Sequence, residues 1–206
     1  MNTQIISVST DYNKAIEQSI HILGNDGIFV FPTDTVYGIG CLHNSKAAVE
    51  KIYQIKGRDF NKPLGVYFSD IDMALQYISG DDSLFKKLAE NYLPGELTII
   101  APKNQLIANY VVSNFDTIGI RIPRNTFLLE LINQLGQPIV GTSANLSNLP
   151  SAKTAKEAYS IFKNQIELII EDDESIQGVE STIVRIANGK VELIRQGILN
   201  INNEFL

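Results

Sequence analysis

Short apolar segments alternate with longer amphipathic segments along most of this 206-residue chain, and this alternation limits the folds that it can adopt. Candidate β-strands lie at 28–31, 63–68, 97–101, 117–123, 138–140 and 166–170. Segments with helical spacing of apolar residues lie at 11–24, 45–57, 70–79, 81–92, 125–136 and 154–164. This alternation predicts an α/β domain whose twisted mixed β-sheet is flanked by helices.

The end of the chain carries the clearest local signal. Residues 181–195 form two alternating runs joined by Asn188-Gly189, a dipeptide typical of a tight β-hairpin. Helix boundaries are marked by Ser45 with Gly57, by Asn125 with Gly136, and by a capping box of Thr154 and Glu157. The sequence contains no linker, internal repeat or low-complexity tract, so one domain is predicted over residues 1–206.

Composition excludes several functional classes. A hydrophobic fraction of 44% and a charged fraction of 19% are those of a folded globular protein. The apolar runs are too short to span a bilayer and the first residues lack a secretory pattern, so no membrane association is expected. The net charge of −6 argues against a broad nucleic-acid-binding surface. The single Cys41 cannot form an internal disulfide, which favours a reducing compartment, and we expect a cytoplasmic protein.

Several common catalytic motifs are absent from the sequence. It has no Walker-type phosphate loop, and GIGCLH has His43 where the third glycine of a dinucleotide motif would stand. Two histidines and one cysteine are too few for the usual zinc sites. Cys41 and His43 lie two residues apart, and a packed cysteine beside a surface histidine is favoured over a thiol nucleophile.

Polar segments at the predicted strand ends are the candidates for ligand binding, and they cover 32–40, 56–64, 141–151 and 195–197. Lys56, Arg58 and Lys62 either clamp a polyphosphate or, in the case of the first two, offset the negative end of the preceding helix. The serines and asparagines of the third segment either bind a ligand or serve turns and caps. Composition alone leaves these alternatives open.

Seven ordered motifs carry a resemblance to a known family. They are PTDTVYGIGC, KGR with NKPL, PGELT, IGIRIP, GTSANLS with PS, GVESTIV and IRQG. In this order they resemble the YrdC/Sua5 family over about residues 13–198. The resemblance implies a YrdC-like single domain with a cationic concave cleft, without the C-terminal domain of the longer Sua5-type members.

The resemblance also implies an activity. Family members with Lys-x-Arg and Ser-x-Asn make L-threonylcarbamoyl-AMP and pyrophosphate from L-threonine, bicarbonate and ATP. The chain is therefore expected to be an L-threonylcarbamoyladenylate synthase, a nucleotidyltransferase that uses ATP with Mg²⁺. Its product would pass to a separate tRNA threonylcarbamoyl transferase complex that forms threonylcarbamoyladenosine, and its partners could include weakly bound tRNA.

The resemblance implies three overlapping sets of site residues and leaves the metal ligands unknown. The signature tetrad, expected to be catalytic, is Lys56, Arg58, Ser143 and Asn145. The residues expected to contact ATP are Arg58, Lys62, Thr117, Ser143, Ser151 and Arg195. The residues expected to contact L-threonine are Thr35, Tyr67, Arg121, Gly141 through its backbone, and Ser181.

Two positions depart from the family pattern, and two other functions stay open. Asp59 and Glu96 stand where proline is common, and an acid beside Arg58 could weaken the contact of Arg58 with phosphate. A YciO-like sibling branch acts on threonylcarbamoyl compounds but lacks the tetrad, so the tetrad favours the synthase. The second alternative, an RNA-binding module, is disfavoured by the acidic composition.

Overall fold

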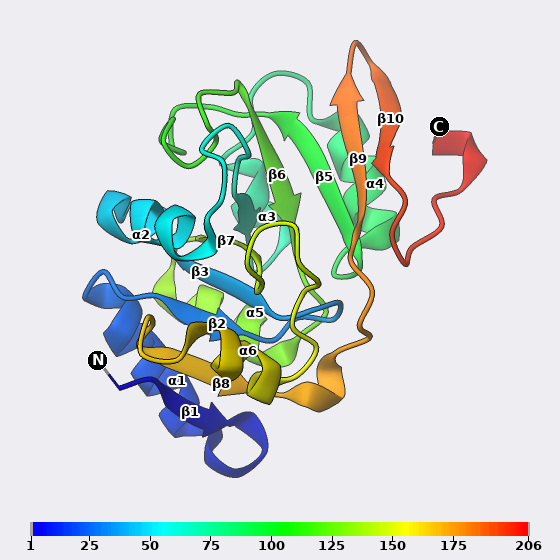
Figure 1. The fold of residues 1–206 in the computed structure, drawn as a ribbon. Helices are drawn as coiled ribbons and strands as arrows, with labels where there is room; N and C mark the ends of the chain where they lie inside the picture. Colours follow the sequence, from blue (N-terminus) through cyan, green and yellow to red (C-terminus); the bar gives the residue numbers. More distant parts are fainter. Residues whose placement is uncertain (1, 206) are drawn as a thin grey trace.

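The computed structural model describes residues 2–205 and contains one mixed β-sheet with helices on its faces (Figure 1). The strands are β1 (Gln4–Ser7), β2 (Phe29–Phe31), β3 (Gly38–Leu42), β4 (Gly65–Tyr67), β5 (Leu97–Pro102), β6 (Thr117–Arg121), β7 (Ile139–Ser143), β8 (Leu168–Glu171), β9 (Thr182–Ala187) and β10 (Lys190–Arg195). The helices are α1 (Val8–Gly24), α2 (Lys46–Lys56), α3 (Ile71–Leu75), α4 (Ser83–Tyr92), α5 (Thr126–Leu135) and α6 (Ala155–Phe162), with 3₁₀ helices η1 (Asp173–Ser175) and η2 (Asn203–Phe205). The predicted α/β class is confirmed.

The sheet extends from β1, near the N-terminus, to the β9–β10 hairpin at the opposite end of the molecule (Figure 1). Its strand order is β1-β8-β2-β3-β7-β4-β6-β5-β9-β10. The parallel pairs are β1–β8, β2–β8, β4–β6 and β5–β9, and the other neighbours are antiparallel. The order brings β3, β7, β4 and β6 together at the centre, although they come from distant parts of the chain.

The predicted hairpin turn and the predicted caps of α2 are confirmed, whereas the capping box is only half formed, because Glu157 accepts from the amide of Lys153 rather than that of Thr154. Asn188 and Gly189 have φ values of 53° and 71°, in the left-handed region that a tight hairpin turn requires. Ser45 caps α2 by accepting a hydrogen bond from the amide of Ala48, and Gly57 ends the helix with a φ of 59°. Local chemistry therefore sets these boundaries.

Three elements differ from the sequence-based expectation. The sequence does not predict β1, because it is a four-residue edge strand whose first two side chains are exposed. The helix predicted at 70–79 ends at Leu75, and the chain then turns to form a β-bridge between Ile78 and Lys103. The segment 38–42 forms β3, although its two glycines hide the apolar pattern of a strand.

Apolar side chains pack on both faces of the sheet, in two clusters. On one face, α1 and α5 pack against Phe29, Phe31 and Leu168. On the other face, α2, α4 and α6 pack against residues of the central strands, including Val66, Ile120 and Val140. Because α1 and α5 cover only the β2–β8 end of this face, they leave the same face of β4, β5 and β6 uncovered.

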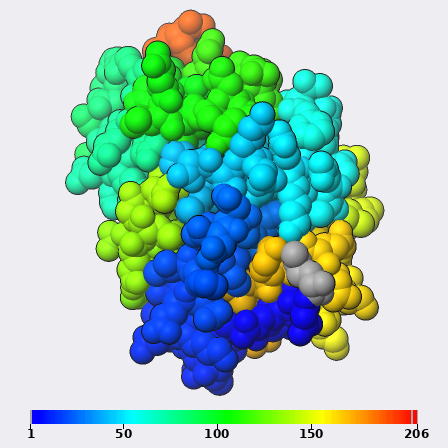
Figure 2. Space-filling model, turned by 90° about the vertical axis from the view of Figure 1, so that its left-hand side faces the viewer, coloured from blue at the N-terminus to red at the C-terminus, as the bar shows by residue number. Residues whose placement is uncertain are grey.

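The described chain forms one continuous body when seen from its side (Figure 2). The N-terminal segments lie at one end of this view, and the tip of the β9–β10 hairpin projects at the other. Within residues 2–205, every helix is too short or too polar to cross a lipid bilayer.

Candidate active site

Glycines occupy matched positions on four neighbouring strands at the centre of the sheet. Gly40 of β3 pairs with Gly141 of β7, Gly141 pairs with Gly65 of β4, and Gly65 pairs with Gly119 of β6. Paired residues of adjacent strands point to the same face of a sheet. The row therefore leaves a strip without side chains, on the face that α1 and α5 do not fully cover.

Polar side chains stand on both sides of this glycine strip. Two residues beyond Gly65 and Gly119, Tyr67 and Arg121 are in register with each other, and Arg121 also pairs with Thr98. Thr117 precedes Gly119 by two residues on the opposite side of the strip. Because successive side chains alternate between faces, all of these groups face the same side as the glycines. The strip thus separates two groups of polar side chains: Tyr67, Arg121 and Thr98 lie on one side of it, and Thr117 lies on the other.

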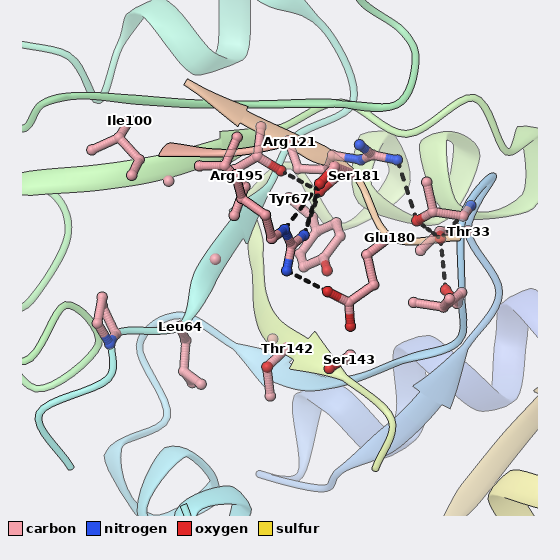
Figure 3. Close-up of a pocket in the computed structure, with 18 of the residues that line it drawn as sticks. Thr33, Leu64, Tyr67, Ile100, Arg121, Thr142, Ser143, Glu180, Ser181 and Arg195 are labelled. Carbon is pink, nitrogen blue, oxygen red and sulfur yellow. Dashed lines mark hydrogen bonds and ion pairs between the residues drawn. The ribbon is translucent and has the colours of Figure 1, made fainter. Parts of the chain in front are cut away.

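Three glycines of the strip, Gly65, Gly119 and Gly141, line a cavity of about 330 Å³ together with the flanking side chains (Figure 3). Nine of the predicted site residues line it: Thr35, Arg58, Tyr67, Thr117, Arg121, Gly141, Ser143, Ser181 and Arg195. Four others do not line it: Lys56, Lys62, Asn145 and Ser151. Lys56 and Asn145 contact the cavity wall from behind, and Ser151 contacts a lining carboxylate.

Arg121 is held at one end of the cavity by a buried ion pair. Its guanidinium contacts the carboxylate of Asp34, and the two side chains are only 5% and 4% exposed. Arg121 Nη2 also lies 3.5 Å from the hydroxyl of Thr35. Within residues 2–205, Arg121 Nη1 and Asp34 Oδ2 have no hydrogen-bond partner in the protein although both are buried. A free donor therefore remains at this end of the cavity, while Asp34 offsets the charge of Arg121.

Arg195 forms a second ion pair, which is more exposed. Its Nη1 contacts Glu180, and its Nη2 donates to the carbonyl of Ser181 at 2.8 Å. Ser151 donates to the other oxygen of Glu180 at 2.9 Å. Both Glu180 and Arg195 are 41% exposed, and the Glu180 side chain extends toward Arg195 inside the cavity (Figure 3).

Lys56 is buried behind the cavity and supports the loop that follows β7. Its Nζ donates to the carbonyls of Ser143 and Asn145 at 2.5 Å each and to Asn145 Oδ1 at 3.0 Å. These three oxygens use the three N–H bonds of an ammonium group. Lys56 is therefore placed to fix the 143–145 backbone rather than to reach into the cavity.

The Ser143 hydroxyl is oriented by the same cluster. Its Oγ donates to Asn145 Oδ1 at 2.8 Å, the oxygen that also accepts from Lys56. Because the single hydroxyl proton is used within the protein, Ser143 presents oxygen lone pairs to the cavity. A hydrogen-bond donor on a ligand, or a cation, would complement this arrangement.

The Arg58 side chain is hydrogen-bonded to the backbone of its own segment, 56–64, which is predicted to bind a polyphosphate. Its Nε donates to the carbonyl of Lys62 at 3.1 Å, and its Nη2 donates to the carbonyl of Pro63 at 2.9 Å. Lys62 thus contributes its backbone to the segment, while its side chain is exposed outside the cavity lining. Arg58 keeps Nη1 for other contacts, because neither bond uses it.

The two departures from the family pattern have local partners. Asp59 accepts a hydrogen bond from the amide of Asn61 at 2.9 Å, and Glu96 accepts one from the side chain of Gln177 at 2.8 Å. Among the ion pairs of the described residues, none joins Asp59 to Arg58. The acid beside Arg58 therefore caps its own loop.

The charge of the cavity is smaller than its arginine content suggests. Arg58, Arg121 and Arg195 line it, but Asp34 pairs with Arg121 and Glu180 pairs with Arg195. The cationic cleft stays a prediction, because two of the three arginines have a carboxylate partner.

Cys41 does not line this cavity. Cys41 is buried in β3, and burial raises the pKa of its thiol, so the thiolate needed for nucleophilic attack is disfavoured. Over residues 2–205, no group of three or more His, Cys, Asp or Glu side chains is arranged to hold a metal ion.

Comparison with known proteins identifies the family. Residues 21–197 match the family of Sua5, YciO and YrdC, which is described as "Telomere recombination". The chain belongs to this family. The match covers the glycine strip and every predicted site residue.

Relatives in the family carry an enzyme name. The threonylcarbamoyl-AMP synthase of Bacillus subtilis is 34% identical over 88% of this chain and 53% of the relative. That of Buchnera aphidicola is 30% identical over 82% of this chain and 98% of the relative. The chain spans about half the length of the first curated relatives that it matches.

Solved structures in the family share the fold. Pyrococcus abyssi Sua5, solved in complex with L-threonine, matches with a TM-score of 0.90 and 30% identity, over 95% of this chain and 58% of that chain. Escherichia coli YciO matches with a TM-score of 0.88 and 23% identity, over 99% of this chain and all of that chain. The second likeness concerns the fold alone.

Two acidic residues of this family member were missed by the sequence analysis. Asp34 precedes Thr35 in the first motif, and Glu180 precedes Ser181 in the sixth. A carboxylate next to each predicted threonine contact was the available signal. Its meaning depends on Arg121 and Arg195, which only the fold brings to these positions.

We expect alanine to be tolerated at Gly119 but not at Gly141. An added Cβ at Gly119 would make an ordinary 3.5 Å contact with Thr98, whereas one at Gly141 would lie 2.6 Å from the carbonyl oxygen of Ile39. Gly119→Ala should change the free energy of unfolding by less than about 1 kcal/mol, and Gly141→Ala should lower it by about 1–3 kcal/mol. Urea denaturation of both variants tests this, and equal losses would contradict it.

The pH dependence of stability should report on Lys56. Burial, with a smaller effect of Arg58 and an opposing effect of Glu180, lowers the pKa of Lys56 from 10.5 to about 7. Between these pH values the unfolded chain binds one more proton than the folded chain, so this residue makes stability rise with pH. The slope is at most about 1.4 kcal/mol per pH unit.

The matched variant is Lys56→Met, which keeps the side-chain length and removes the titrating group. The free energy of unfolding should be measured by urea denaturation between about pH 7.5 and 9, which lies above the lowered pKa. The difference between the parent and the variant should increase with pH. Parallel curves would contradict the lowered pKa.

Proposed function

We propose that the chain is an L-threonylcarbamoyl-AMP synthase, which converts L-threonine, bicarbonate and ATP into L-threonylcarbamoyl-AMP, pyrophosphate and water. The observation that carries the proposal is a cavity whose two polar ends are separated by glycines of three neighbouring strands. One end suits an amino acid and the other suits a polyphosphate. The names of the Bacillus and Buchnera relatives support the same activity.

The amino-acid end is formed around Arg121. Its Nη1 is buried and has no partner within the described protein, so a carboxylate could accept from it. Thr35, Tyr67 and Ser181 line the same end and offer hydroxyl groups. The backbone at Gly141 completes this end. The bound L-threonine in the related Sua5 structure supports an amino-acid ligand.

The nucleotide end contains Arg58, Thr117 and Ser143. Arg58 is proposed to contact the phosphates through Nη1, which its two backbone hydrogen bonds leave available. The lone pairs of Ser143 suit a donor group or the Mg²⁺ that accompanies ATP. Arg195 and the exposed Lys62 are proposed to contact the outer phosphates.

The cavity volume constrains how the nucleotide binds. About 330 Å³ is at the lower end of the range for ligand pockets, which is about 300–1,000 Å³. This volume suits an amino acid together with the reacting phosphate, so the adenosine is expected to lie toward the cavity mouth. Ser151 donates its proton to Glu180, and its oxygen could therefore accept from a ribose hydroxyl there.

The proposed chemistry needs positioned groups rather than a protein nucleophile. The amine of threonine and bicarbonate form a carbamate with loss of water. A carbamate oxygen then attacks the α-phosphorus of ATP while the bond to the β-phosphate oxygen breaks, and pyrophosphate leaves in line. Arg58 and Arg195 would stabilise the charge on the phosphates, and Lys56 with Asn145 would fix the position of Ser143.

The proposed pathway role follows from the product. A carbamoyl-adenylate is a reactive mixed anhydride, so a second enzyme that transfers its acyl group must consume it. The expected acceptor is tRNA, through a transferase complex that forms threonylcarbamoyladenosine. The net charge of −6 favours transfer of the product over tight binding of tRNA to this chain.

The YciO-like sibling activity is the second candidate, because the fold likeness to YciO spans nearly the whole chain. The tetrad distinguishes the two candidates. Lys56, Ser143 and Asn145 form one hydrogen-bonded cluster here, which favours the synthase.

We expect pyrophosphate release to depend on L-threonine. The purified protein with ATP, Mg²⁺ and bicarbonate should release pyrophosphate when L-threonine is added, and product formation should be visible by mass spectrometry. Release that is equal with L-serine or without an amino acid would count against the synthase. Cleavage of threonylcarbamoyl compounds without nucleotide would instead support the sibling activity.

Arg58→Ala should abolish threonine-dependent pyrophosphate release, with a loss of about a hundredfold or more. The physical reason is the loss of a guanidinium at the nucleotide end. The matched control is Arg185→Ala, which removes the same charge from an exposed position on β9. Circular dichroism should show that both variants fold. Normal turnover by Arg58→Ala would refute the assigned role.

A further inference from the structure

Two ion pairs lie within electrostatic reach of Tyr67 in the cavity. Burial is the main cause that raises the pKa of its phenol, and the charges of Arg121, Asp34, Arg195 and Glu180 also act on it. The two pairs stand near one another, because Thr98, which pairs with Arg121, is hydrogen-bonded to Ser181, the residue whose carbonyl accepts from Arg195.

The two pairs differ in how readily they exchange partners. The Arg121–Asp34 pair is almost fully buried, with exposures of 5% and 4%, and breaking it would leave an uncompensated buried charge. The Arg195–Glu180 pair is 41% exposed on both sides, so water and ions can replace either partner at little cost. An anionic ligand would therefore exchange with the second pair.

Arg195 does not depend on Glu180 for its position. Its Nε and Nη2 both donate to the carbonyl of Ser181, at 3.2 Å and 2.8 Å. Glu180 occupies only Nη1 of Arg195, and it also accepts from the Ser151 hydroxyl. In this structure, the Glu180 carboxylate thus satisfies two of the groups proposed to bind ATP, as a phosphate oxygen would.

We propose that a nucleotide polyphosphate takes Arg195 from Glu180, and that the released Glu180 carboxylate binds the amino group of the amino-acid substrate. This inference rests on the proposed function and adds a specificity-determining residue to it. It predicts that nucleotide binding strengthens amino-acid binding, because one ligand frees the group that the other needs.

The charge distribution of the cavity supports the second half of the proposal. An amino acid carries an ammonium group as well as a carboxylate, and the three lining arginines can bind only the latter. Among the described residues, Glu180 is the only carboxylate that lines the cavity. It precedes Ser181, which is assigned to the amino-acid end, and Asp34 is turned to Arg121 and does not line the cavity.

The test uses Glu180→Gln, which keeps the side-chain shape and a hydrogen-bond acceptor for Ser151 but removes the charge. The control is Glu192→Gln, which makes the same change at an exposed position on β10, the strand of Arg195. The probe is an ATP analogue with a methylene group between the α- and β-phosphates, and isothermal titration calorimetry measures its affinity. Without threonine, Glu180→Gln should bind it about two- to fivefold more tightly than the parent.

The second measurement is the affinity for L-threonine with and without the saturating analogue. The parent protein and Glu192→Gln should bind L-threonine more tightly when the analogue is present. Glu180→Gln should lose this enhancement and bind L-threonine several-fold more weakly in the presence of the analogue. A role confined to structure would not produce tighter nucleotide binding together with lost coupling.

The outcomes separate this inference from the proposed function. The role of Glu180 would be overturned if Glu180→Gln had the same affinities as Glu192→Gln, or if it bound the analogue more weakly. Neither result would contradict the proposed function, which is tested by threonine-dependent pyrophosphate release from the parent protein. A parent protein that releases no pyrophosphate and binds neither ligand would overturn both. Tighter analogue binding with loss of coupling would support the exchange.

Discussion

Backbone pairing between β3, β7, β4 and β6 fixes the register on which the cavity depends. The register aligns Gly40, Gly141, Gly65 and Gly119, and a shift of one residue would replace the row with apolar side chains such as Val66 and Ile120. The same register sets Tyr67 with Arg121 on one side of the strip and Thr117 on the other. The two ends of the cavity are therefore a consequence of strand alternation, with loops adding groups to a pattern that the sheet already contains.

Burial decides which charges in the cavity are permanent. Arg121 forms a buried ion pair with Asp34, so the orientation of its guanidinium is fixed before a ligand enters the cavity. Arg195 is anchored through a backbone carbonyl and shares its remaining donor with an exposed carboxylate, which makes that contact exchangeable. A fixed cation suits recognition of an invariant carboxylate. A cation with an exchangeable partner, such as Arg195, suits a phosphate group, because that group enters with a substrate and leaves with a product.

Local signals made much of this structure predictable from the sequence. Asn188-Gly189 and Ser45 act within a few residues, so their turn and cap could be read directly. Motif resemblance supplied Arg121 and Arg58 as candidates, and both line the cavity. The strand order and the pairing of glycines could not be derived, because they depend on contacts between β3, β7, β4 and β6 across a hundred residues of chain. Glu180 escaped notice for a different reason: its partner Arg195 lies only 15 residues away, across the predicted hairpin, but no local motif marks the two side chains as a pair.

The position of Lys56 bears on how a cavity of this kind would accelerate a reaction. A lysine in a phosphate-binding motif is ordinarily assigned to the phosphate, but each N–H bond of Lys56 is directed at an oxygen of Ser143 or Asn145. Lys56 therefore acts through the loop, by holding Asn145 Oδ1 where it accepts a hydrogen bond from Ser143. This leaves the Ser143 oxygen oriented before any ligand arrives. Groups fixed in advance need no rearrangement during the reaction, which is how a site without a protein nucleophile can lower a barrier.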